Sequence, residues 1–297
     1  MVYCCHSHSF CRVRDLRYRC GRDLAGGLAR HWVQLSLDEA TQAFLRWCAR
    51  GPTTTEIFKT SLSRILRWCM SATDANALLG RGEMFALSRW QATQLLGRCE
   101  AAGSLLDVGA GVGLVTEQLA PLFDKVIATE ASAPMARQLR RRGFSVLGSA
   151  DLAGLEALAQ REGIDGGFNC ISLVNVLDRC DRPLSLLQDL KRRLKPDGRL
   201  LLAVVLPFKP FVEHGIFKLQ PTERLSLDRS ATWESAVEEL WQLLQSLGFK
   251  LEALTRVPYL CKGDLTTRRE TGKCGRPVRP DFSGLPTSIS WTTPSSC

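Results

Sequence analysis

The sequence lacks several patterns that would assign it to a familiar class of site or compartment. Its 12 cysteines include no Cys-x-x-Cys pair, so neither a zinc ribbon nor a thioredoxin-like redox motif is supported. No apolar run approaches the roughly 18 residues that cross a membrane, and the start of the chain has no apolar stretch typical of a secretory signal. These absences predict a soluble, intracellular protein with reduced thiols, attached to a membrane at most peripherally.

Two common nucleotide-binding patterns are also missing. The stretch 107–113, DVGAGVG, is rich in glycine, but Leu114 stands where the dinucleotide fingerprint, counted from Gly109, requires its third glycine. No Gly-Lys-Ser/Thr sequence follows, which excludes a Walker-type phosphate loop. The glycines must therefore serve a ligand other than a dinucleotide or a nucleoside triphosphate.

Positive charge is in excess: the net charge is +9 and the isoelectric point is about 9.1. Much of it lies in short clusters, at 12–22, 140–142, 191–193 and 268–279. Two of these fall on predicted helix faces, where solvated charge is the ordinary explanation. The charge is compatible with acidic partners, but we expect no nucleic-acid partner from it.

Composition divides the chain into four parts. Residues 1–31 are irregular and rich in Arg and Cys, 32–100 form a helical extension, 101–264 form the main domain, and 265–297 form a disordered tail rich in Thr, Ser, Pro, Gly and Arg. In the extension, apolar residues recur at helical spacing from Trp32 onward. We expect this helical pair to pack on the main domain; a partner-binding groove is the alternative.

The main domain alternates strand and helix, which predicts a mostly parallel sheet with helices on both faces, an α/β fold. The predicted strands are 104–109, 125–130, 144–149, 168–174, 198–206 and 249–260. The predicted helices are 114–123, 133–143, 183–194 and 232–248.

The ends of the first two strands suggest a cofactor. Glycines at 109, 111 and 113 let the backbone approach a ligand at a helix N-terminus, and Asp107 can hold the turn and face an ammonium group. Glu130, at the end of the second strand, can accept both ribose hydroxyls of an adenosine; its alternative is a place beside a helix N-cap. An adenosine joined to an amino acid without pyrophosphate describes S-adenosylmethionine.

Six segments in order, LLGRGEMF, LLDVGAGVG, IATE, VNVLDRCDRPLSLL, AVVLPFKPFVE and TRVPYLCKGD, resemble the DREV-type protein-histidine methyltransferases, the methyltransferase-like protein nine family. The likeness covers residues 32–264. It implies a Rossmann-like class I S-adenosylmethionine-dependent fold and location in the endoplasmic reticulum and mitochondrion. It also implies methylation of the N-pros nitrogen in His-x-His sequences of protein substrates, with a small residue in the middle. We also expect a monomer.

The resemblance also assigns residues. By matching position, Glu130, Asn175 and Tyr259 correspond to cofactor-contacting residues, and Asp178 corresponds to an acid near the substrate imidazole. A carboxylate that accepts the Nε2–H of the imidazole leaves Nδ1 free to attack, so we assign the catalytic role to Asp178 together with Asn175. Arg81, in a Gly-Arg-Gly turn, is assigned to the methionine carboxylate or to substrate ordering, with an exposed turn arginine as the alternative.

Two polar residues that follow Asp178 receive structural interpretations. Asp181, shortly before Pro183, is expected to cap the next helix. Cys180 has no evident base, and we expect a buried thiol and no nucleophile.

The chain departs from the family at two places. Residues 150–167 are expected to form an added surface loop. The final antiparallel strand is expected to be missing or replaced, which would leave 249–260 as an exposed edge. This makes an inactive or weakly active interaction protein one alternative. A nucleic-acid methyltransferase is the other, although the Asn/Asp-Pro-Pro-Tyr/Phe pattern of amino-methylating enzymes is missing.

The N-terminus carries a cluster of potential metal ligands, but no second ligand pair at finger-like spacing, so we assign no metal. His6-Ser7-His8 also matches the His-x-His arrangement and suggests self-methylation as a hypothesis. Solvated histidines are the plainer interpretation. The cluster consists of Cys4, Cys5, His6, His8 and Cys11.

Overall fold

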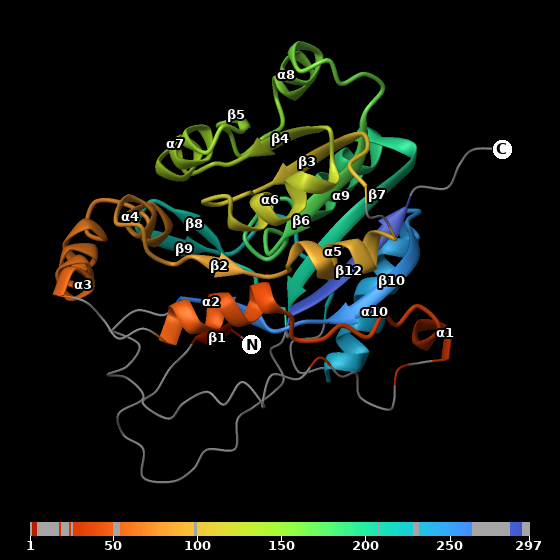
Figure 1. The fold of residues 1–297 in the computed structure, drawn as a ribbon, viewed down its shortest axis with the longest axis horizontal. Helices are drawn as coiled ribbons and strands as arrows, with labels where there is room; N and C mark the ends of the chain where they lie inside the picture. Colours follow the sequence, from red (N-terminus) through yellow and green to blue (C-terminus); the bar gives the residue numbers. More distant parts are fainter. Residues whose placement is uncertain are drawn as a thin grey trace, which may run out of the picture.

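A seven-stranded sheet forms the centre of the molecule (Figure 1). The structure is a computed structural model. It describes residues 2–4, 18, 24, 26–49, 54–97, 100–206, 208–227, 232–262 and 286–292. The strand order is β10-β12-β7-β6-β3-β4-β5. The bounds are β3 Ser104–Val108, β4 Lys125–Thr129, β5 Ser145–Leu147, β6 Phe168–Val174, β7 Leu194–Val205, β10 Lys250–Arg256 and β12 Pro286–Thr292.

The strands β3 to β7 run parallel, and β12 pairs antiparallel with both β7 and β10. All five residues of β3 are buried, as expected for a central strand covered on both faces. The predicted α/β fold with a mostly parallel sheet is confirmed.

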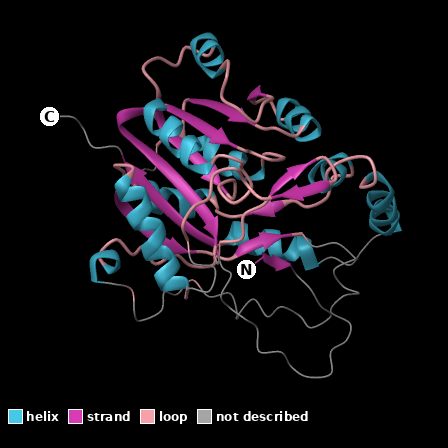
Figure 2. Cartoon of the chain, turned by 180° about the vertical axis from the view of Figure 1, so that it is seen from behind, coloured by secondary structure: helices cyan, strands magenta, loops and turns pink. Residues whose placement is uncertain are grey.

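Helices cover both faces of the sheet, as Figures 1 and 2 show from opposite sides. Buried side chains of α8, α9 and α10 belong to one apolar cluster, and those of α5 and α6 belong to a second. Within the described residues, no helix combines the length and hydrophobicity that a bilayer crossing requires. The bounds are α5 Arg89–Leu96, α6 Leu114–Leu119, the 3-10 turn η2 Ala120–Leu122, α7 Ala133–Arg141, α8 Leu155–Arg161, α9 Pro183–Arg193 and α10 Trp233–Ser246.

Short elements lie outside this central layer. Strands β1, β11 and β2 form a small sheet, and β8 and β9 form a hairpin that follows β7 in the chain. The N-terminal extension is helical, as predicted. The bounds are β1 Val2–Cys4, α1 Gly26–Ala29, α2 Glu39–Ala49, α3 Thr54–Leu66, α4 Ala72–Leu78, β2 Met84–Phe85, β8 Val212–His214, β9 Phe217–Leu219 and β11 Tyr259–Cys261.

The first helix of the extension begins later than its apolar spacing predicted. Trp32 forms a bridge with Leu254 of β10, and the Val33 N–H donates to the Leu254 carbonyl at 2.8 Å. Helix α2 starts only after Asp38, whose carboxylate accepts the Thr41 N–H at 2.9 Å. The apolar residues before Asp38 thus pack as extended chain against the sheet.

The expectation that the final strand is missing, and that the whole tail is disordered, is wrong for residues 286–292. Strand β12 lies between β7 and β10, so β10 has a partner and residues 249–260 are not left as an unpaired edge. The strand comes from the divergent tail, which replaces the segment expected from the family. Residues 263–285 and 293–297 lie outside the described residues.

Two local predictions also require correction. The expected surface loop at 150–167 contains helix α8, because Leu155 and Leu158 bury their side chains in the core. Asp181 does not cap α9: its carboxylate instead accepts the Thr222 N–H at 2.8 Å and the Thr222 hydroxyl at 2.7 Å. At the start of α9, the free backbone N–H of Ser185 donates instead to the Glu223 carboxylate at 2.9 Å.

Candidate functional site

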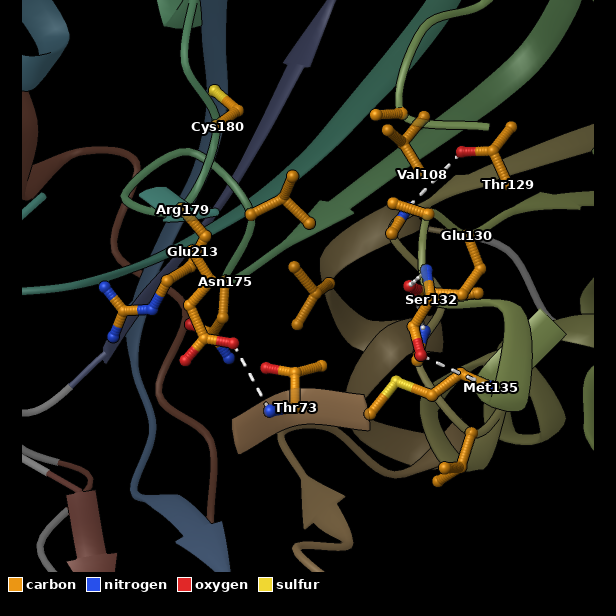
Figure 3. A pocket seen from close by; sticks show the side chains of 18 of the residues that line it. Thr73, Val108, Thr129, Glu130, Ser132, Met135, Asn175, Arg179, Cys180 and Glu213 are labelled. Carbon is orange, nitrogen blue, oxygen red and sulfur yellow. Dashed lines mark hydrogen bonds between the residues drawn. The ribbon is translucent and has the colours of Figure 1, made fainter. Parts of the chain in front are cut away.

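A cavity of about 570 Å³ opens at the carboxyl ends of the parallel strands, where open α/β sheets bind ligands. Its walls come from the turn after β3, the ends of β4 and β6, the start of α4, and the β8–β9 hairpin. Figure 3 shows Asn175, Arg179 and Glu213 on one side of this cavity and Glu130, Ser132 and Met135 on the other.

The three predicted glycines have different tasks. Gly109 and Gly111 line the cavity, and both have positive φ, 68° and 61°. A Cβ on Gly109 would lie 2.4 Å from Val176 Cγ2, whereas a Cβ on Gly111 would meet no atom within 4 Å. Gly111 therefore leaves its backbone open to a ligand. Gly113 does not line the cavity; it lets α6 approach α7, where its Cβ would lie 2.8 Å from Leu139.

Glu130 lies where the sequence placed it, at the end of β4 and in the cavity wall. One carboxylate oxygen accepts the Gly111 N–H at 2.8 Å, and the other accepts the Ser132 N–H at 2.8 Å. Burial raises the pKa of this carboxyl, while these backbone N–H groups oppose the rise. The side chain therefore braces the glycine turn and presents a buried acceptor to the cavity. The alternative place beside a helix N-cap also holds, since Ser132 caps α7.

Asp107 supports the turn from below. Its two oxygens accept the hydroxyls of Thr116 and Ser172, each at 2.6 Å, and it is not among the residues that line the cavity. Burial raises the pKa of the Asp107 carboxyl to about 6, although both hydroxyl bonds lower it. Of its two predicted roles, these contacts support holding the turn and do not support facing an ammonium group.

Asn175 follows β6 directly and lines the cavity. It is the one non-glycine residue with positive φ, 57°, in the described part of the chain. This conformation costs about 1 kcal/mol and is concentrated at functional sites. The side-chain nitrogen donates to the Met84 sulfur at 3.2 Å, and the buried Oδ1 has no hydrogen-bond partner.

Asp178 lies beside the cavity without lining it. One carboxylate oxygen pairs with the Arg179 guanidinium at 2.8 Å, and the other, Oδ1, is buried without a hydrogen-bond partner. Burial raises the pKa of this carboxyl, and Arg179 opposes the rise. The structure thus holds a carboxylate that can still accept one hydrogen bond.

Arg179 does line the cavity and joins Asp178 to the segment before the hairpin. Its guanidinium lies 3.9 Å from the centre of the Phe211 ring, and Lys218 of β9 lies 4.2 Å from the same ring. The Phe211 N–H also donates to the Asp178 carbonyl at 3.0 Å. The position of Asp178 therefore depends on contacts that reach to the hairpin.

Two acidic residues of the cavity wall were not singled out from the sequence. Asp74, in α4, accepts the Ser132 hydroxyl at 2.5 Å. Glu213, in β8, accepts the Thr73 N–H at 3.3 Å and so joins the hairpin to the start of α4. Glu213 is the last residue of the AVVLPFKPFVE segment, and this part of the family resemblance could have pointed to it. Asp74 had no comparable signal, because α4 was not predicted.

The other predicted residues are placed as follows. Arg81 is buried, not exposed, and does not line the cavity; its guanidinium donates to the Lys59 carbonyl at 3.4 Å. Cys180 lines the cavity, and burial raises the pKa of its thiol to about 12, which disfavours a nucleophilic thiolate. Tyr259 lies in β11, but its side chain is outside the described part of the structure.

The N-terminal Cys/His cluster lies outside the part of the chain whose side chains the structure describes. Cys5, His6, His8 and Cys11 lie outside the described residues, as does the side chain of Cys4. Within the part of the chain that the structure does describe, no group of three or more His, Cys, Asp or Glu side chains could hold a metal ion.

The cavity fits the cofactor expected from the sequence. Glu130 offers buried carboxylate oxygens for ribose hydroxyls, and the open side of Gly111 leaves space for a ligand against the backbone. The unpartnered Oδ1 of Asn175 can accept a hydrogen bond from a bound molecule. Among the described residues that line the cavity, the acids Asp74, Glu130 and Glu213 outnumber the one cation, Arg179, which suits a positively charged sulfonium.

Comparison with known families identifies the chain. The family model described as DREV methyltransferase matches residues 17–269. The chain belongs to the DREV methyltransferase family. Its central sheet has the class I methyltransferase arrangement, with an antiparallel β12 between β7 and β10, and its cofactor is S-adenosylmethionine.

Individual curated relatives match this chain at less than 30% sequence identity. The ubiquinone biosynthesis O-methyltransferase, mitochondrial, of Schizosaccharomyces pombe is 28% identical over 109 residues, which span 36% of this chain and 39% of that protein. The enzyme of the same name from Xanthomonas axonopodis pv. citri is 24% identical over 191 residues, 62% of this DREV chain and 79% of the relative.

Solved structures are similar at low identity. The [4+2]-cyclase SpnF is 15% identical with a TM-score of 0.46, over 82% of this chain and 98% of that one. The Burkholderia thailandensis 1,6-didemethyltoxoflavin-N1-methyltransferase, solved with S-adenosylhomocysteine, is 17% identical with a TM-score of 0.42, over 88% and 92%.

Proposed function

We propose that this DREV methyltransferase methylates the N-pros nitrogen of histidine in His-x-His sequences of protein substrates that have a small middle residue. Membership of the family supports methyl transfer, and the motifs from 78 to 264 support the choice of histidine. Catalytic roles for Asp178 and Asn175 are part of the same proposal.

The unpartnered Oδ1 of Asp178 is the observation that carries the proposal. A buried carboxylate oxygen without a hydrogen bond is costly, and an incoming N–H donor would satisfy it. An imidazole has such a donor on the nitrogen opposite the one that reacts. Because Asp178 does not line the cavity, the ring reaches it past Arg179, whose side chain is 44% exposed and can change rotamer.

Methyl transfer to histidine requires mainly that the protein position the imidazole. Histidine is largely neutral at neutral pH, so its nitrogen needs no strong base. Asp178 accepts the Nε2–H and holds the tautomer in which the Nδ1 lone pair is free. The bound cofactor supplies the methyl group from its sulfonium. Formation of the N–C bond would break the methyl–sulfur bond and leave a neutral thioether. The positive charge would move onto the ring, where the Asp178 carboxylate stabilises it until the ring loses its Nε2 proton.

Charge around the cavity favours this class of substrate over nucleic acid. In the part of the cavity wall that the structure describes there are three acids and one cation, an arrangement that repels phosphates and suits a ring that becomes cationic. The alternative of an inactive interaction protein rested on the loss of the last strand, and β12 occupies that place in the sheet. Location in the endoplasmic reticulum and mitochondrion remains part of the proposal, on the family resemblance alone. We also propose that the protein is a monomer.

The test compares Asp178→Asn with the wild-type chain on a His-Ala-His peptide. We expect the turnover number to fall by about 100-fold or more, with cofactor affinity within about threefold of wild type, because only tautomer selection and charge stabilisation are removed. Mass spectrometry detects the methyl group, and NMR of the product distinguishes the N-pros from the N-tele isomer.

Asp181→Asn is the matched control. It removes a carboxylate three positions along the same loop, and this carboxylate bonds Thr222 and does not line the cavity. Equal turnover in wild type and Asp178→Asn would reject the role of Asp178. Cofactor binding without methylation of any His-x-His peptide would reject histidine as the substrate.

A further inference from the structure

Exposed apolar side chains are concentrated at one end of the molecule. In the described part of the chain, every exposed large hydrophobic residue except Trp90 belongs to α3 and the turn after it, to α4, or to the β8–β9 hairpin. The most exposed are Trp68 at 85%, Phe58 at 69% and Phe217 at 64%. Together with Ile65, Ile216 and Leu219 we call them the apolar rim. Concentration of this kind marks an interaction surface.

The two parts of the apolar rim both adjoin segments that line the cavity. Glu213 of the hairpin bonds the Thr73 N–H at the start of α4, a few residues after Trp68. Thr73 and Gly215 both line the cavity, and Gly215 precedes Ile216 at the hairpin turn. Figure 1 shows α3, α4 and the hairpin gathered at the same end, and Figure 3 shows the bond between Thr73 and Glu213.

The charge on these segments is positive. Arg64 and Arg67 are exposed beside Ile65 and Trp68, and Lys218 is exposed between Phe217 and Leu219. Residues 54–69 contain one acid, Glu56, whose side chain lies outside the described part of the structure, against three basic residues. In the hairpin, the acid Glu213 is turned toward Thr73.

We propose that the apolar rim docks this methyltransferase on the surface of an anionic lipid bilayer. Exposed Trp and Phe side chains enter the headgroup region, and neighbouring Arg and Lys side chains bind lipid phosphates. A helix and a hairpin turn present these groups as projections, which suits a deformable lipid surface better than a rigid groove. Docked in this way, the cavity mouth lies next to the bilayer, and substrates held at the membrane reach it first.

The same charges disfavour a second copy of the chain as the occupant. In a two-fold contact the same patch faces itself, which brings Arg64 and Arg67 toward their counterparts, while residues 54–69 supply only one acid, Glu56, against three basic residues. An anionic bilayer supplies the missing negative charge. The proposal does not depend on which substrate the cavity modifies.

The test is flotation of the full chain with vesicles of phosphatidylcholine alone or mixed with phosphatidylserine. The double variant Trp68→Ser, Phe217→Ser keeps the net charge of +9. We expect it to lower the partition coefficient for the mixed vesicles by at least tenfold. The double variant Arg64→Gln, Arg67→Gln removes most of the preference for phosphatidylserine. Trp90→Ser, which removes an exposed tryptophan outside the rim, stays within twofold of wild type.

Three results would overturn the proposal. One is no flotation of wild type with mixed vesicles at low salt. Another is equal flotation of wild type and the Trp68→Ser, Phe217→Ser variant, which would show that net charge alone drives binding. The last is a wild-type dimer in sedimentation that this variant abolishes, without vesicle binding, which would assign the rim to self-association. Cofactor binding by each variant shows that it is folded.

Discussion

Replacing Glu130 with Gln tests the cofactor site most directly. In the structure the two carboxylate oxygens accept the backbone N–H groups of Gly111 and Ser132, each at 2.8 Å. A glutamine keeps one acceptor oxygen but turns an NH₂ donor toward one of these N–H groups. It also removes the charge that strengthens acceptance of ribose hydroxyls.

Hydrogen bonds to a charged group contribute about 1.5–3 kcal/mol, so we expect the dissociation constant for S-adenosylmethionine to rise about 10- to 100-fold. Isothermal titration calorimetry at neutral pH measures this change. Glu156→Gln serves as the control, because that acid is 70% exposed and does not line the cavity. A variant that stays folded and binds the cofactor as tightly as wild type would refute the assignment.

The pH dependence gives a second readout of Glu130. Burial raises the pKa of its carboxyl, and the carboxylate is the form that accepts hydrogen bonds. Wild-type affinity is therefore complete above the raised pKa and is lost as pH falls through it. Glu130→Gln lacks this titration, so the two affinities should converge at acidic pH. Asp107 titrates nearby, with a pKa of about 6 that the Glu130 charge helps to raise, so Glu130→Gln should also lower the pKa of Asp107.

Three further predictions concern the turn, the loop and the sheet. Gly111→Ala should cost about 1 kcal/mol of stability and abolish cofactor binding. Gly109→Ala should cost about 2–3 kcal/mol, because its Cβ also meets the stiff side chain of Val176. Chemical denaturation measures both losses of stability. Arg179→Gln should leave Asp178 buried without its cation and so raise the pKa of that carboxyl further. The acid limb of the pH–rate profile would then move to higher pH, while Arg179→Lys restores it. A chain ending at 285 should melt about 10 °C or more below one ending at 292, because only the longer one can form Pro286–Thr292; equal melting by differential scanning fluorimetry would contradict the sheet assignment.

Local sequence patterns were sufficient to predict the central layer and part of the site. Apolar runs bounded by turns mark the buried strands, and amphipathic spacing marks the helices that cover them. Once strand and helix alternate, the carboxyl ends of the strands must meet at one edge. For this reason Gly109, Gly111 and Glu130 could be placed at one cavity from their positions alone, whereas Asn175 was added by the family resemblance.

Contacts between distant segments decided the rest. Asp181 precedes a helix, which locally predicts a cap, yet its carboxylate bonds Thr222, 41 positions away. Glu213 and Thr73, 140 positions apart, form a hydrogen bond in the cavity wall. No local pattern around either residue predicts this contact.

The last strand shows the same limit most clearly. PTSISWT contains only two large apolar residues, and a polar stretch of this kind predicts a tail. What makes it a strand is the space between β7 and β10, whose unpaired backbone groups accept and donate along both of its edges. Apolar periodicity is encoded residue by residue, whereas a vacant place in a sheet exists only after the other strands have assembled.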